Sequence, residues 1–126
     1  MKYLCLVYFD EKKLHAVPES PEDSECHAYS EQLREQGYAI ASAPLAPVET
    51  AATVRVNNGR VTVTDGPFAE TKEQLGGFYM IEARDMNEAI QVAEKIPAAR
   101  IGCIEVRPVR ELDLEPGVVR ASASGA

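Results

Sequence analysis

The chain has 126 residues, of which 45% are apolar, and it carries a formal net charge of −7. This length and composition fit one globular domain with a hydrophobic core. The excess of acidic groups repels phosphate backbones and anionic lipid surfaces, so we expect neither nucleic acid nor a membrane as a partner.

The N-terminal stretch MKYLCLVYFDE lacks the pattern of an export signal, and no apolar run reaches the roughly 20 residues of a membrane helix. Cys5, Cys26 and Cys103 are scattered without CxxC spacing, which is typical of reduced cytosolic thiols. We therefore expect the protein in the cytoplasm. Two histidines without clustered cysteines, and no glycine-rich phosphate motif, predict neither a metal site nor a cofactor.

Residues 3–9, YLCLVYF, are apolar on both alternating faces, which predicts a central strand that is covered on both sides. Residues 20–37 predict a helix, with Ser20 as the N-cap, Pro21 at the first helical position and Gly37 as a left-handed stop. The apolar stripe of this helix consists of Cys26, Tyr29 and Leu33.

Residues 38–45 predict a strand whose Pro44 limits central pairing in a sheet. A hairpin is predicted over residues 53–65, TVRVNNGRVTVTD, because two alternating arms flank Asn58-Gly59, a pair that tolerates a tight turn. The arms are polar on their other face, so we expect the hairpin to be half exposed. Its apolar positions are Val54, Val56, Val61 and Val63.

Residues 77–83, GFYMIEA, predict a second strand that is apolar on both faces. A helix follows, with Asp85 as the N-cap and Pro97 ending the pattern. Residues 103–109, CIEVRPV, predict the last strand, which Pro108 places at an edge or a strand end. The apolar stripe of the second helix is predicted at Met86, Ala89, Ile90, Ala93 and Ile96.

The predicted order is a βαβ–βαβ skeleton with an inserted hairpin, in a domain of residues 1–112 followed by a flexible tail of residues 113–126. Two helices cover only one face of a four-stranded sheet, whereas residues 3–9 and 77–83 are apolar on both faces. A second copy of the same sheet is the simplest cover for the other face. We therefore predict a homodimer in which sheet packs on sheet.

Residues 65–77 read DGPFAETKEQLGG, between MKYLCLVYFDE at the start and GCIEVRPV near the end. With these stretches, the chain resembles the YCII-related family, in its DGPF branch, over residues 1 to about 110. The resemblance implies a ferredoxin-like βαββαβ α+β fold with an inserted β-hairpin, assembled as a dimeric α/β-barrel. It implies no assigned reaction. Some members occur beside genes for extracytoplasmic-function sigma factors, which implies a sigma-factor-related association.

The resemblance also implies a catalytic pair, formed by a histidine on the first helix and an aspartate near the middle of the chain. Asp65 matches the aspartate through DGPF. The histidine position falls nearest Cys26, one residue from His27, and one residue turns a helical side chain by about 100°. A YCII-like lyase that removes halide from a chlorinated hydroquinone shows that chemistry is possible on this scaffold. We take Asp65 and His27 as the candidate catalytic residues.

Three candidate ligand contacts each have a structural alternative. Tyr29 either bonds a ligand or lies in the core with a satisfied hydroxyl group. Phe68 is expected to anchor its loop in the core, with stacking on a substrate as the alternative. Arg107 either neutralises an acidic ligand or pairs with Asp65 or Glu105.

Two further candidates lie in the polar loop that follows Asp65, where Glu70 and Lys72 could line the mouth of a pocket or pair on the surface. Gly76-Gly77, at the end of this loop, is expected to allow a close backbone approach.

Two classes of function stay open. One is cofactor-independent acid–base chemistry, such as elimination, on a small and aromatic molecule. The other is a non-catalytic module that binds a small ligand or assists transcription through protein contacts.

Overall fold

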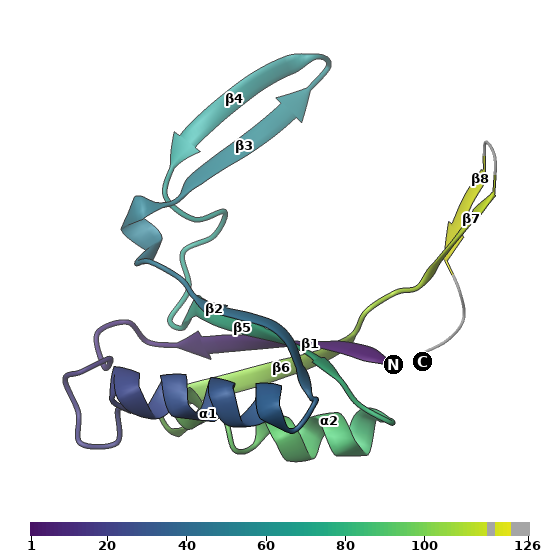
Figure 1. Cartoon of the computed structure of the whole chain (residues 1–126). Coiled ribbons are helices and arrows are strands. Elements are labelled where there is room, and N and C mark those ends of the chain that lie inside the picture. Colours follow the sequence, from purple (N-terminus) through teal and green to yellow (C-terminus); the bar gives the residue numbers. More distant parts are fainter. Residues whose placement is uncertain (116–117, 122–126) are drawn as a thin grey trace.

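The computed structural model describes residues 1–115 and 118–121, with side-chain burial for residues 1–112. Its centre is an antiparallel four-stranded sheet in the order β2-β5-β1-β6 (Figure 1). This order, with one helix after β1 and one after β5, confirms the predicted ferredoxin-like α+β fold with an inserted hairpin. The sheet and its helices comprise β1 (Lys2–Phe9), α1 (Asp23–Glu35), β2 (Ala39–Pro44), β5 (Gln74–Glu82), α2 (Met86–Ala93) and β6 (Gly102–Pro108).

β1 is a central strand, as its two apolar faces predict, because it pairs with β5 on one side and β6 on the other. Strands β2 and β6, which carry Pro44 and Pro108, are the two edges of the sheet, where a residue without an N–H is tolerated. The helix-facing side of β1 is buried and consists of Tyr3, Cys5, Val7 and Phe9.

Helix α1 buries Leu33 and ends where Gly37 adopts the predicted left-handed conformation, at φ +81°. Its start differs from the prediction, because the helix begins at Asp23 and Ser20 is not the N-cap. The Ser20 hydroxyl oxygen instead accepts a 2.8 Å hydrogen bond from the backbone N–H of His15. Ser20 therefore closes the turn before the helix.

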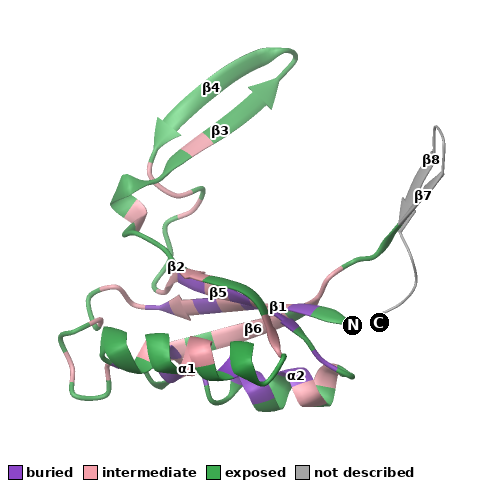
Figure 2. Cartoon of the chain, viewed as in Figure 1, coloured by how far each residue is buried: buried purple, intermediate pink, exposed green. Residues whose placement is uncertain are grey.

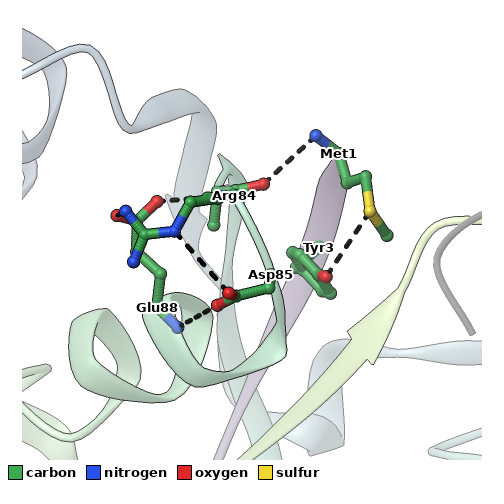
Figure 3. Close-up of polar contacts among 6 residues, drawn as sticks. Met1, Tyr3, Arg84, Asp85 and Glu88 are labelled. Carbon is green, nitrogen blue, oxygen red and sulfur yellow. Dashed lines mark hydrogen bonds and ion pairs between the residues drawn. The ribbon is translucent and has the colours of Figure 1, made fainter.

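Helix α2 begins with the predicted cap (Figure 3). The Asp85 carboxylate accepts a 2.9 Å hydrogen bond from the Glu88 N–H, and the Glu88 carboxylate accepts one of 2.8 Å from the Arg84 N–H. The first bond satisfies an N–H that a helix start leaves without a partner, and the second fixes the residue before the cap. The backbone groups of Met1 and Ala83 bond each other beside this cap, so the chain start is fixed there.

The predicted apolar stripe of α2 needs one correction. Ile90 is 46% exposed, whereas Val92 is 6% exposed. The helix ends at Ala93, three residues earlier than a stripe reaching Ile96 requires, and Pro97 begins a short 3₁₀ helix, η2 (Pro97–Ile101). The buried set is therefore Ala89, Val92, Ala93 and Ile96.

Both helices lie on the same side of the sheet (Figure 1). The other side, which we call the open face, carries the alternate residues of β1 and β5. Leu4 lies opposite Met80 and Leu6 lies opposite Phe78, and these four side chains are only partly buried. The predicted two-sided apolar character of the sheet is therefore present, with helices over one side.

The inserted hairpin has the predicted form, with β3 (Ala52–Asn57) and β4 (Arg60–Asp65) joined at Asn58 and Gly59. Both turn residues have positive φ, at +51° and +77°. It projects from the sheet on the side away from the helices, and it is exposed along nearly its whole length (Figures 1 and 2). The expectation of a half-exposed hairpin is wrong for the single chain, because its valines are also exposed.

A short 3₁₀ helix, η1 (Val48–Thr50), precedes this hairpin. Beyond β6, the chain forms a second hairpin of β7 (Leu112–Glu115) and β8 (Val118–Ala121). The predicted flexible tail of residues 113–126 includes 116–117 and 122–126, which lie outside the described residues. Within the described ranges, no helix has both the length and the apolar character to cross a membrane.

Candidate functional site

A cavity of about 640 Å³ opens between α1 and the edge strand β2, with the start of β5 behind it. Its volume lies within the roughly 300–1,000 Å³ that small-molecule sites occupy. Apolar side chains of β1 and β5 form its floor, among them Val7, Phe9 and Tyr79. The exposed residues Ile40 and Leu45 lie along its β2 side.

Gly76 shapes the floor of this cavity. A Cβ atom at Gly76 would lie 2.3 Å from the ring of Phe9, so only glycine leaves room for that ring. A Cβ atom at Gly77 would lie 3.0 Å from the Ala43 carbonyl oxygen of β2. The predicted role of Gly76-Gly77 in close approach is confirmed.

Most of the polar lining of the cavity comes from one stripe of α1. His27, Ser30, Glu31 and Arg34 are spaced three or four residues apart, so they lie on the same side of the helix. Sequence reasoning identified only His27 among them. The i, i+3, i+4, i+7 spacing of these polar residues was the signal that could have found the others.

The charged groups at the rim are mostly paired with each other. Arg34 forms an ion pair with Glu31, and His15 lies 3.4 Å from the carboxylate of Asp23. His27 is exposed at the same rim, and its side chain enters no hydrogen bond or ion pair with residues of the described part. Its imidazole is therefore available to a molecule in the cavity.

Tyr79 and Ser30 both line the cavity. Burial raises the pKa of Tyr79, and the nearby Ser30 side chain offsets part of that rise. The phenol is therefore protonated near neutral pH. Together, Tyr79 and Ser30 offer a donor and an acceptor beside an otherwise apolar surface.

Asp65 lies elsewhere, exposed at the end of β4, and it is not among the residues that line the cavity. The base of the hairpin is held by Gly66, which is at φ +99° and whose N–H donates to the Ala51 carbonyl oxygen at 2.7 Å. The Thr53 hydroxyl donates to the Gly66 carbonyl oxygen at 2.9 Å. The single chain thus does not bring Asp65 to the cavity that His27 lines.

Phe68 is 81% exposed, so the expectation that it anchors its loop in the core is wrong for the single chain. Gly66 turns the backbone at the end of β4, and the buried core beside the loop already holds Phe9. The Phe68 ring lies outside both the core and the cavity lining.

The Tyr29 hydroxyl is occupied, because it donates a 2.7 Å hydrogen bond to the Val92 carbonyl oxygen of α2. Its ring meets Tyr79 edge-on, with centroids 6.3 Å apart. Burial is the main cause that raises the pKa of Tyr29 to about 12. The structural alternative for this residue, a core position with a satisfied hydroxyl group, is the one observed.

Arg107 pairs with Glu105, with a 2.8 Å hydrogen bond from its Nε atom, as the structural alternative predicts. It is exposed on β6 opposite Leu4, which places it on the open face and away from the cavity. Glu70 and Lys72 are exposed in the loop before β5. Lys72 borders a shallow hollow with Tyr8 and Cys103, but neither loop residue enters an ion pair in the described ranges.

Together, these features define a ferredoxin-like α+β protein with a cavity of ligand size beside its first helix. The chain belongs to the YCII-related domain family, whose model matches residues 1–113.

A curated relative is an uncharacterized protein of Rhizobium meliloti (strain 1021). It is 38% identical over 114 residues, which cover 86% of this chain and 92% of that protein. A similar solved structure is the 5-chloro-2-hydroxyhydroquinone dehydrochlorinase TftG of Burkholderia phenoliruptrix AC1100, in complex with 2,5-dihydroxybenzoquinone. It has a TM-score of 0.53 at 17% identity and covers 86% of this chain and 93% of that chain. At that identity, the likeness supports the fold alone.

Proposed function

We propose that the cavity between α1 and β2 binds a small, single-ring aromatic molecule, and that His27 transfers a proton to or from it. The observation that carries the proposal is the cavity itself, with its apolar floor and an imidazole free at its rim. Imidazole is the side chain whose ordinary titration range suits proton transfer near neutral pH. The dehydrochlorinase complex with 2,5-dihydroxybenzoquinone, a ring of this size on a similar fold, supports the class of ligand.

The reaction that fits this arrangement is a cofactor-independent elimination. The His27 imidazole removes a proton from the ligand, and the leaving group departs with the bonding electron pair, so no oxidant or reductant is needed. The Ser30 and Tyr79 hydroxyl groups hydrogen-bond to ring oxygens and orient the molecule. Because His27 is exposed, its imidazolium returns the proton to water.

We also propose that the protein is a cytoplasmic homodimer in which the open faces of two copies pack together. Leu4, Leu6, Phe78 and Met80 form a continuous apolar patch across the two central strands. Such a surface is stable in water when another layer covers it.

The binding step is tested by isothermal titration of the chain with 2,5-dihydroxybenzoquinone as the probe. Ser42 lies on the exposed edge strand and lines the cavity, so Ser42→Trp obstructs the site without disturbing the core. We expect binding to wild type and at least tenfold weaker binding to Ser42→Trp. Equal affinity in both proteins, or no binding to wild type, contradicts a ligand site here.

The proton-transfer step is tested with His27→Gln, and His15→Asn is the matched control. His15 is also an exposed histidine near α1, and asparagine tolerates its positive φ of +61°. With a halogenated hydroquinone as substrate, we expect halide release by wild type and by the control, and a loss of at least about 100-fold in His27→Gln. Equal rates of halide release in all three proteins would show that His27 takes no part in the reaction.

A second candidate is a ligand-binding module without catalysis. The position of Asp65 favours it, because the predicted partner of His27 lies outside the cavity lining of the single chain. If the protein is such a module, we expect the binding isotherms described above but no halide release. A sigma-factor-related association through protein contacts stays a prediction under this reading.

A further inference from the structure

The β3–β4 hairpin presents an apolar surface that nothing in the described part of the chain covers. Val54 lies directly opposite Val63, and Val56 lies opposite Val61, so the four side chains share one side of the hairpin. We call this side the valine face. Its residues are 61% to 66% exposed.

We propose that this hairpin is an arm that packs its valine face against a second copy of the chain, which rests on the homodimer proposed above. A two-stranded hairpin alone in water is marginally stable, and three strands or a packing partner are normally needed. The described hydrogen bonds around Gly66 join the two ends of the hairpin to each other, at its base. The arm therefore requires a surface that its own copy does not provide.

The direction and length of the arm suit a second copy. The arm projects past the open face, on the side opposite the helices (Figure 1). Each of its strands has 6 residues, and at about 3.4 Å per residue it extends about 20 Å. Stacked sheets lie about 10 Å apart. An arm of this length passes the edge of a sheet stacked on the open face and reaches the helix layer of the second copy.

The charge distribution also favours a second copy as the occupant. The hairpin, residues 52–65, contains Arg55, Arg60 and Asp65, a formal charge of +1. The whole chain carries −7, so the remainder carries −8. A cationic arm is attracted to the acidic remainder of another copy, whereas the two acidic bodies repel each other without it.

The proposal is tested with a charge-matched pair of double variants in the same strand. Val61→Lys/Val63→Lys places two charges on the valine face, and Thr62→Lys/Thr64→Lys places two charges on the opposite face of β4. All four residues are exposed, so both variants should retain the fold. We expect sedimentation equilibrium to show a dimer dissociation constant at least tenfold higher for the valine variant and within threefold of wild type for the threonine variant.

A direct measurement uses mixed dimers of isotope-labelled and unlabelled wild-type chains. Isotope-filtered NOEs from the methyl groups of Val54, Val56, Val61 and Val63 to the unlabelled copy are expected. A monomeric wild type, equal dissociation constants for the two double variants, or valine methyl groups without intermolecular NOEs in a stable dimer each overturn the proposal. None of these outcomes affects the ligand titrations, so failure of the arm is distinguishable from failure of the cavity.

Discussion

The Tyr29 hydroxyl donates a 2.7 Å hydrogen bond to the Val92 carbonyl oxygen, and so joins α1 to α2 on the covered side of the sheet. This bond uses the only polar group of a side chain that is otherwise packed against the core. Tyr29 thus supports the wall of the cavity from behind, and His27, two residues earlier on α1, lines it.

Tyr29→Phe removes this bond and leaves the Val92 carbonyl oxygen with only the 3.3 Å hydrogen bond from the Lys95 N–H. We expect the free energy of unfolding to fall by about 0.5–1.5 kcal/mol in urea denaturation. Ligand affinity should stay within twofold of wild type, because Tyr29 does not line the cavity. A large loss of ligand affinity with unchanged stability would instead show that Tyr29 contacts the ligand.

Gly76→Ala introduces a methyl group where the ring of Phe9 lies 2.3 Å away. We expect a loss of about 1–3 kcal/mol of stability, typical of an overpacked core, together with weaker ligand binding because Phe9 forms part of the floor. Adding Phe9→Leu to Gly76→Ala should cost less than the sum of the two single changes, since it removes the clashing ring. Strict additivity in a double-mutant cycle would show that the added methyl group at position 76 does not clash with the ring of Phe9.

Glu25 provides a pH-dependent contribution to stability. The Arg100 guanidinium donates two hydrogen bonds of 2.7 Å to this carboxylate, and these bonds are the main cause that lowers the pKa of Glu25. Because the folded-state pKa lies below the unfolded one, the stabilisation is present above the unfolded pKa and is lost as pH falls through the folded pKa.

We therefore expect wild type to have a higher Tm than Glu25→Gln at about pH 7, and the difference to shrink as the pH is lowered toward about 3. Glu94→Gln is the control, because it also removes one exposed glutamate. It should show no such convergence. A Tm difference for Glu25→Gln that grows on acidification would have the wrong sign for this ion pair.

The cysteines should label in order of exposure. Burial raises the pKa of Cys5 to about 11, and this thiol is fully enclosed in the core. Cys103 is exposed, although desolvation and the nearby Glu73 raise its pKa. With iodoacetamide at about pH 8, mass spectrometry should find Cys103 modified first and Cys5 only when the protein unfolds. Early modification of Cys5 would contradict the packing of β1.

The fold could be predicted from the sequence because its signals are local. The alternation of residues 3–9, the Asn58-Gly59 turn, the Asp85 cap and the Gly37 stop each specify backbone geometry within a few residues. The errors fall where tertiary contacts decide the outcome. Ser20 bonds to His15 across a turn instead of capping a helix, and Ile90 is exposed because the buried side of α2 carries Ala89, Val92 and Ala93.

The site was less predictable for a related reason. The motif around Asp65 is conspicuous in sequence, yet it lies at the base of a projecting hairpin, and the cavity is lined by the inconspicuous polar stripe of α1. A hydrophobic residue such as Phe68 is expected in the core on average, but it is 81% exposed, which the local sequence does not reveal.

The central claim is that the cavity beside His27 is a ligand site, and a crystal structure with a bound hydroxylated single-ring compound tests it most directly. We expect the ring between α1 and β2, with a ligand atom within about 3 Å of the His27 imidazole and hydrogen bonds to Ser30 or Tyr79. A ring bound only in the shallow hollow between Lys72 and Cys103, or only on the open face, would contradict the account.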